Sequence, residues 1–205
     1  IRPRDWSSDV CSSDLACAKK GVKVAIVFAS GFAEVSAEGA RKQREMAEKA
    51  RARGLRLIGP NAMGAMSLAP RFSATFSSIH KHHGGNGWPK PGVVAVVSQS
   101  GAGGTQTIVQ LRDRGVGLSR WVATGNQCDV DVAEAIEYCA QDDATKVIAL
   151  YMEGATSGPR LIAALEAARR AGKPVIALKV GRSEAGAKAV ASHTASLAGE
   201  DRVYD

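Results

Sequence analysis

Aromatic residues are scarce in this chain, at 5% of its 205 residues, whereas apolar residues make up 45%. That apolar content is enough for the core of one large domain or two small ones. A composition rich in Ala, Val and Gly but poor in aromatics favours closely packed βαβ layers over an all-β sandwich. No apolar run reaches about 18 residues, which excludes a membrane-spanning helix. The N-terminus also lacks the charged-then-apolar order of a signal peptide.

Cysteine and histidine are sparse too, and their spacing indicates no metal centre. Three of the four histidines crowd into one polar segment with no acidic or cysteine partner nearby, namely His80, His82 and His83. The cysteines form no C-x-x-C pair and have no metal-ligand spacing with histidine; they are Cys11, Cys17, Cys128 and Cys139. We therefore predict no bound metal and a reducing, cytoplasmic setting.

The net charge of +7 does not by itself indicate a nucleic-acid partner. Lys and Arg alternate with Glu in "ARKQREMAEKARARG" (40–54), which is typical of a solvated helix face. A mild positive field also suits a small, phosphate-rich ligand. We predict a small-molecule partner, and neither nucleic acid nor a membrane.

The first fifteen residues have a separate origin in our interpretation. The stretch "DWSSDVCSSDL" (5–15) is polar and self-similar, and it has no helical or strand period. Its back-translation matches a common sequencing adapter. We therefore exclude residues 1–15 from the fold, as expression scars are excluded. We also expect the natural protein to start further upstream and this chain to be truncated at both ends.

From Gly21 onward the apolar pattern becomes regular. The β-branched run "VKVAIVFAS" (22–30) predicts a buried strand. Residues 36–54 have helical composition, with Ser36 as a plausible N-cap and Gly54 as a stop. Residues 55–60 form a short strand ended by proline. This order predicts one parallel βαβ unit. The stretch 69–92 is rich in Pro, Gly, Ser and His without a period, and it predicts an interdomain linker.

A second series of elements predicts a doubly wound parallel sheet. Its apolar strands alternate with helices, and ligands in such sheets bind beyond the carboxyl ends of the strands. The predicted strands are 93–98, 118–124, 146–152 and 174–180, and the predicted helices are 101–115, 131–143 and 158–172.

Polar or small residues follow each of these strands. Ser100, Gly101 and Ala102 lead directly into a helix, an arrangement suited either to binding an anion on free N–H groups or to tight packing. Asn126, with Asp129 and Asp131, either touches a ligand or metal or caps the next helix. Glu153 either orients another group or acts as a helix-capping or ion-paired carboxylate.

His193 follows the last predicted strand and lies among small residues, which leaves room beside its imidazole. A neutral imidazole nitrogen attacks phosphoryl groups well when an acceptor such as Glu153 holds the other nitrogen. The helix start at Ser100 would stabilise the transferred phosphate. Together these strand ends predict a phosphohistidine site, with His193 and Glu153 as its catalytic pair.

Seven collinear stretches carry a family resemblance: the chain is similar to the NDP-forming acyl-CoA synthetases, relatives of the succinyl-CoA synthetase α subunit. The stretches are "SGFAE" (30–34), "RLIGPNAMGAMS" (56–67), "VAVVSQSGAGG" (94–104), "GNQCDVDVAEAIEY" (125–138), "ALYMEG" (149–154), "KPVIALKVGRSEAGAKA" (173–189) and "SHTASLAG" (192–199). One departure is Ala195, where some relatives have Gly.

The resemblance implies a reaction: acyl-CoA, ADP and phosphate are converted reversibly to acid, CoA and ATP. The phosphoryl group passes from an acyl phosphate to a histidine, matched here by His193, which is hydrogen-bonded by the glutamate matched by Glu153. The resemblance places CoA against Phe28, Ala29, Ser30 and Asn61. It also places Thr105 near the acyl substrate, and we assign Asn126 to the substrate as well.

The implied fold is α/β in two parts. Residues 16–88 would form the C-terminal part of a Rossmann-like CoA-binding domain with its linker. Residues 89–205 would form a doubly wound parallel, flavodoxin-like domain that carries the phosphohistidine.

The implied cofactors are CoA, together with ADP or ATP and Mg²⁺ on an ATP-grasp domain or subunit outside this chain. The implied assembly is a homo- or hetero-oligomer. Two alternatives stay open at this point. The region resembles the CoA-binding regulatory part of protein lysine acetyltransferases, and it is also compatible with a non-catalytic ligand-binding module.

Overall fold

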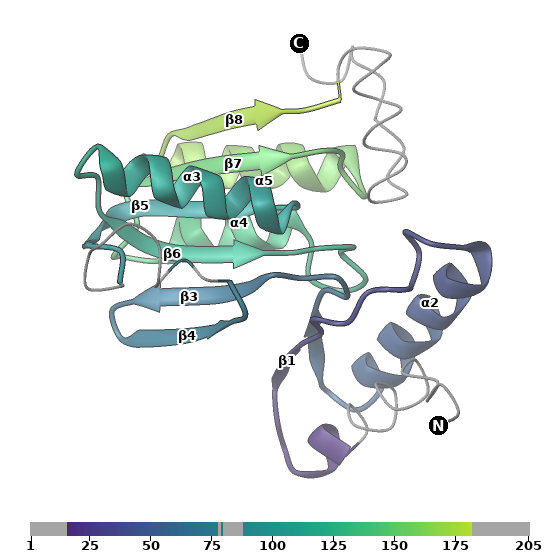
Figure 1. Cartoon of the computed structure of the whole chain (residues 1–205). Coiled ribbons are helices and arrows are strands. Elements are labelled where there is room, and N and C mark those ends of the chain that lie inside the picture. Colours follow the sequence, from purple (N-terminus) through teal and green to yellow (C-terminus); the bar gives the residue numbers. More distant parts are fainter. Residues whose placement is uncertain (1–15, 78, 80–87, 182–205) are drawn as a thin grey trace.

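Two β-sheets organise the computed structural model, which describes residues 16–77, 79 and 88–181 (Figure 1). One sheet has two strands and the other has six. The smaller sheet and its helix, the first unit, lie on the side of the larger sheet where β5, β6 and β7 end (Figure 1). No helix among the described residues is long and apolar enough to cross a membrane.

The first unit is the predicted βαβ crossover. Strand β1 (Val24–Ile26) pairs in parallel with β2 (Arg56–Ile58), and α2 (Ala37–Arg51) connects them. The predicted cap is confirmed, because the Ser36 hydroxyl accepts a hydrogen bond from the Gly39 backbone N–H at 3.0 Å. Gly54 has a positive φ of 71°, the conformation that ends a helix. The strands are shorter than the apolar runs that predicted them.

A β-hairpin corrects the predicted linker over 69–92. Strands β3 (Gly64–Leu68) and β4 (Arg71–Thr75) pair antiparallel, and β3 also pairs antiparallel with β6. The linker prediction is therefore wrong for residues 71–75. Strand β4 is half exposed and polar, as an edge strand can be, so its own sequence carries little strand signal. The hairpin precedes the predicted boundary at residue 89, yet it belongs to the larger sheet.

The larger sheet has the strand order β4-β3-β6-β5-β7-β8, and its last four members are parallel. Counted from β5, those four follow the order 2-1-3-4 of a flavodoxin-like sheet, which confirms the predicted fold class. In this order the switch point lies between β5 and β7. The strands are β5 (Pro91–Ser98), β6 (Leu118–Ala123), β7 (Val147–Met152) and β8 (Val175–Lys179).

Helices cover both faces of this sheet and agree with the predicted ranges to within about two residues. They are α3 (Gly101–Asp113), α4 (Val132–Gln141) and α5 (Gly158–Arg170). Figure 1 shows α3 in front of the sheet and the other two helices behind it.

Alternate residues of β5 face the two hydrophobic cores. Val96 joins the α3 side with Ile108 and the fully buried Trp121. Ala95 and Val97 join the α4–α5 side. This alternation is what a strand buried on both faces requires.

Candidate functional site

Helix α3 begins directly beyond the end of β5, and its N-terminus forms the first part of the site. The buried Ser100 caps the helix, since its hydroxyl accepts from the Gly103 N–H at 3.1 Å. The first turn of this fully described helix contains no acidic side chain. Its free N–H groups and positive dipole end are therefore suited to an anion. Anion binding by Ser100, Gly101 and Ala102 stays a prediction.

The glycines of this turn also have a packing role. A Cβ on Gly101 would lie 2.6 Å from the Met63 Cβ, and one on Gly103 would lie 2.6 Å from the Tyr151 ring. Close packing therefore explains these glycines whether or not an anion binds. The same contacts bring Met63, from the loop before β3, onto the start of α3.

Glu153 directly follows the neighbouring strand β7 and forms the second part of the site. It is 4% exposed. The helix-cap alternative for it is wrong, because α5 is capped by Ser157. Burial raises the pKa of Tyr151, two residues earlier, and the nearby charge of Glu153 raises it further.

Gln99 holds the turn that carries Glu153. Its side-chain Oε1 accepts from the backbone N–H of Glu153 at 2.6 Å and from that of Gly154 at 2.9 Å. Gln99 is buried and was not among the predicted residues. His193 lies outside the described residues, so its partnership with Glu153 stays a prediction.

The strand ends of the first unit bring together the residues expected to contact CoA. The Asn61 N–H donates to the Ala29 carbonyl at 2.8 Å, and Asn61 itself has a positive φ of 56°. Phe28 stacks edge-to-face on Phe76, with ring centroids 5.5 Å apart. Phe28 and Ser30 are exposed. An exposed aromatic ring and hydroxyl beside a strand end suit a nucleotide-like ligand, and CoA contact here stays a prediction.

Asn126 lies in the β6–α4 loop, and its side chain meets the first unit. It donates to carboxylate oxygen Oε2 of Glu34 and, at 2.9 Å, to Oε1 of Gln43. Asn61 donates to its Oδ1 at 3.4 Å. Glu34 and Gln43 were not predicted as site residues, although Glu34 lies in the "SGFAE" stretch.

Thr105 lies on the first turns of α3, and its hydroxyl is 3.3 Å from that of Ser77. Ser77 follows β4 and was hidden in the stretch predicted to be a linker. The structure therefore places a second hydroxyl beside the residue expected near the acyl group. Substrate contact by Thr105 stays a prediction.

The two aspartates of the β6–α4 loop have different roles. Asp131 caps α4, as predicted, by accepting from the Glu134 N–H at 2.9 Å. Asp129 is not a cap. Its buried carboxylate pairs with Arg51 and Arg56 and accepts from the Leu57 N–H at 2.9 Å. Asp129 thus ties the larger sheet to the first unit.

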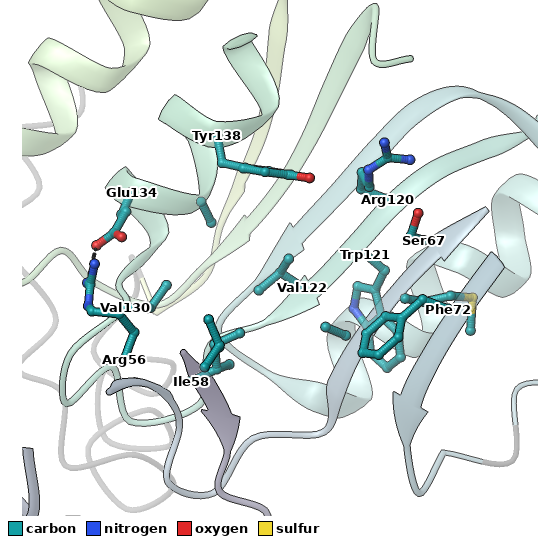
Figure 2. Close-up of a pocket in the computed structure, with 14 residues that line it drawn as sticks. Arg56, Ile58, Ser67, Phe72, Arg120, Trp121, Val122, Val130, Glu134 and Tyr138 are labelled. Atoms are coloured by element: carbon teal, nitrogen blue, oxygen red, sulfur yellow. Dashed lines mark hydrogen bonds and ion pairs between the residues drawn. The ribbon is translucent and has the colours of Figure 1, made fainter. Parts of the chain in front are cut away.

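A separate, mainly apolar cavity of about 350 Å³ lies between the first unit, helix α4 and strands β3, β4 and β6 (Figure 2). Ile58, Val122 and Phe72 line it, and the Arg56–Glu134 ion pair closes one side. It contains none of the predicted site residues. The described residues include no group of three or more His, Cys, Asp or Glu side chains arranged for a metal.

Similar proteins match both the sequence and the fold. Residues 91–205, more than half of the chain, match the family of succinyl-CoA ligase like flavodoxin domains. The α subunit of ADP-forming acetate–CoA ligase II of Pyrococcus furiosus is 40% identical over 191 residues, which cover 93% of this chain and 40% of that one. ADP-forming acetate–CoA ligase I of Archaeoglobus fulgidus is 40% identical over 189 residues, covering 92% of this chain and 26% of that one.

The structure of dinucleotide-forming acetyl-coenzyme A synthetase 1 from Ca. Korarchaeum cryptofilum, in its apo form, superposes with a TM-score of 0.83 at 34% identity. The match covers 97% of this chain and 41% of that one. The same enzyme in complex with phosphate and ADP gives a TM-score of 0.82 at 36% identity. This chain thus spans between about a quarter and two-fifths of the length of these relatives.

The fold and the strand-end site define a mixed α/β protein whose largely parallel sheet has a switch point between β5 and β7. The chain belongs to the succinyl-CoA ligase family through its flavodoxin-like domain. The predicted resemblance to NDP-forming acyl-CoA synthetases is confirmed by relatives that are ADP-forming acid–CoA ligases.

Proposed function

We propose that this chain is part of an ADP-forming acyl-CoA synthetase that works through a phosphohistidine at His193. The observation that supports it most is the placement of the α3 N-terminus, capped by Ser100, next to the buried Glu153 at the ends of adjacent strands β5 and β7. A helix N-terminus suited to an anion and a buried carboxylate stand together at the switch point, where ligands of such sheets bind.

The proposed roles combine this arrangement with the roles that the family resemblance implies for His193 and Glu153. An imidazole nitrogen of His193 attacks the phosphorus of an acyl phosphate; the P–N bond forms, the P–O bond breaks and the acid leaves as a carboxylate. Glu153 accepts a hydrogen bond from the other ring nitrogen and stabilises the positive charge on the ring. The N–H groups at the start of α3 bind the phosphoryl oxygens. ADP then takes the phosphoryl group from the histidine.

CoA and the nucleotide occupy different parts of the proposed enzyme. We place CoA at the strand ends of the first unit, around Phe28 and Asn61. We place ADP or ATP, with Mg²⁺, on an ATP-grasp domain or subunit outside this chain, which makes the working enzyme an oligomer or a longer polypeptide. Mg²⁺ would there neutralise phosphate charge. The reduced cysteines Cys17, Cys128 and Cys139 fit the cytoplasmic setting that we propose.

The test is phosphorylation of the complete enzyme with γ-labelled ATP and Mg²⁺. We expect acid-labile, base-stable label that is absent in His193→Ala and reduced in Glu153→Gln. His82→Ala is the matched control and should retain the label. Label that persists in His193→Ala would reject the phosphohistidine assignment.

The acid substrate of the proposed enzyme can be identified by assaying a panel of carboxylic acids. Relatives named for acetate (40% identical), 4-hydroxybutyrate (33%) and trans-feruloyl-CoA (32%) all cover about nine-tenths of this chain. Acetate, a hydroxy acid and an aromatic acid are therefore the first substrates to assay. These relatives give no support to the lysine acetyltransferase alternative. CoA binding without any phosphoryl exchange would instead indicate the non-catalytic module.

A further inference from the structure

Four polar side chains form a hydrogen-bonded network where the first unit meets the larger sheet. Asn126 lies at its centre and donates through Nδ2 to Glu34 and to Gln43, while Asn61 donates to its Oδ1. The backbone reinforces the same contact, because the Asn126 N–H donates to the Pro60 carbonyl at 2.9 Å. The network joins four segments: the loop after β1, helix α2, the loop after β2 and the loop after β6.

Both N–H donors of the Asn126 amide are engaged in this network. An amide nitrogen carries two N–H donors, and both have acceptors in the first unit. Its oxygen already accepts from Asn61. The side chain therefore has no N–H left for a substrate, and its contacts assign it to holding the two units together.

Glu34 also shapes the loop after β1. Its Oε1 accepts from the backbone N–H of Gly31 at 2.5 Å and from that of Phe32 at 3.3 Å. This loop directly follows Ser30 and the strand end expected to contact CoA. Burial raises the pKa of Glu34, but the hydrogen bonds from Asn126 and from these backbone groups outweigh it and leave the pKa below its ordinary value. One carboxylate thus holds both the loop and Asn126.

We propose that Glu34 and Asn126 act as a positioning pair that fixes the CoA-binding strand ends relative to the phosphate site at the start of α3. The inference rests on the proposed function. Asn126 belongs to the loop after β6, and β6 is hydrogen-bonded to β5, whose end carries Ser100. The pair therefore links the two ligand sites through one loop and one pair of strands.

The two half-reactions of the proposed function differ in how much they depend on the distance between the CoA-binding strand ends and the phosphate site. Phosphoryl transfer between ATP and His193 does not involve CoA. In thioester formation, the CoA thiolate attacks the carbonyl carbon of the acyl phosphate; the C–S bond forms, the C–O bond breaks and phosphate leaves. That step needs the first unit held at the correct distance from the phosphate site, and a displacement near 1 Å can slow a reaction by about a hundredfold.

Exchanging the two side-chain types tests the contact directly. Glu34→Gln keeps an oxygen for Gly31 and Phe32 but turns an N–H donor toward Asn126. Asn126→Asp turns a carboxylate toward Glu34. The double variant restores a donor–acceptor pair in reversed order. Glu38→Gln, on the exposed side of α2, is the matched control, because Glu38 pairs only locally with Arg41.

The experiment uses the complete enzyme and measures the rates of both half-reactions, acyl-CoA formation and His193 labelling from ATP. We expect each single variant to slow acyl-CoA formation by roughly tenfold and to leave the rate of His193 labelling from ATP within about twofold, and we expect the double variant to recover most of the loss. The positioning role would be overturned if the rates of acyl-CoA formation and of His193 labelling fell equally, or if neither rate fell. It would also be overturned if the double variant did not recover the rate of acyl-CoA formation. Absence of label in the unmodified enzyme would instead overturn the proposed function on which this role depends.

Discussion

The side chain of Gln99 accepts two hydrogen bonds from the backbone at Glu153 and Gly154, and so joins the ends of β5 and β7 across the switch point of the sheet. Gln99 follows β5 immediately, one residue before the cap of α3. Together with the hydrogen bond from the Gln99 N–H to the Tyr151 carbonyl at 3.0 Å, this side chain holds the start of α3 beside the buried carboxylate of Glu153.

Replacing Gln99 should therefore lower stability. Gln99→Leu leaves two buried N–H groups without their acceptor, at a cost of about 1–3 kcal/mol for each unsatisfied group. Urea unfolding followed by tryptophan fluorescence measures the loss. Gln99→Glu keeps the acceptor oxygen and should be destabilised less than Gln99→Leu. Equal stability of Gln99→Leu and the unmodified protein would show that these hydrogen bonds contribute little.

Substitutions at Ser100 should separate stability from activity. Ser100→Ala removes the cap of α3 and should cost about 1 kcal/mol. Ser100→Asp keeps a capping oxygen and favours the helix dipole, but it places a negative charge where the phosphoryl group is expected. We predict near-normal melting for Ser100→Asp together with loss of His193 labelling. Normal labelling of this variant would argue against phosphate binding at the α3 N-terminus.

The stability of the contact between the two units should depend on pH through Asp129. Burial raises the pKa of Asp129, but hydrogen bonds from Arg56, Arg51 and the Leu57 N–H outweigh it, so the pKa lies below its ordinary value. Its contribution is therefore complete above the unfolded-state pKa of about 4 and is lost as the pH falls through the lowered native pKa.

Asp129→Asn should cost about 2 kcal/mol at pH 7, and the difference from the unmodified protein should shrink at about pH 3. Unfolding curves at the two pH values measure it. Asp113→Asn, at the exposed end of α3, serves as the control. A difference that stays constant with pH would mean that the Asp129 charge is not what joins the units.

Alanine at position 104 should not bring the stabilisation that a glycine-to-alanine change usually brings to a helix. Replacing a glycine inside a helix with alanine normally adds up to about 1 kcal/mol. A Cβ here would lie 2.2 Å from the Ser98 Oγ and 2.8 Å from the Trp121 Nε1, which are hydrogen-bonded to each other at 3.3 Å. Gly104→Ala should therefore destabilise by about 1–3 kcal/mol. Gln106→Ala, at an exposed position of α3, should change stability little in the same thermal melts.

The elements that were predicted correctly can be recognised from the pattern of their own residues. Ser36 and Gly54 bound α2, and apolar runs mark β5 and β7, because burial on both faces requires continuous hydrophobicity. Strand β4 was missed because its stability comes from pairing with β3 rather than from its own half-exposed residues. Edge strands of this kind are specified by partners elsewhere in the chain.

The candidate site likewise contains some residues that could be predicted from the sequence and others that could not. The positions of Ser100 and Glu153 could be predicted because each lies within two residues of the end of an apolar strand. Gln99 and Glu34 could not, because their partners lie 54 and 92 residues away in the chain and a side-chain hydrogen bond leaves no period in the sequence. Substrate contact by Asn126 stays a prediction, and its hydrogen bonds to Glu34 and Gln43 could not be predicted either, because these partners are also distant in the chain.

The β3–β4 hairpin decides where the gene can be divided when parts are exchanged between relatives. A piece beginning at residue 89 would lose the strand that pairs Met66 with the buried Trp121, and with it the hydroxyl of Ser77 beside Thr105. It would also leave β6 with an unpaired edge, which promotes aggregation. A chimera joined just before Gly64 keeps the whole sheet, and the residues around Thr105 are then inherited as one piece.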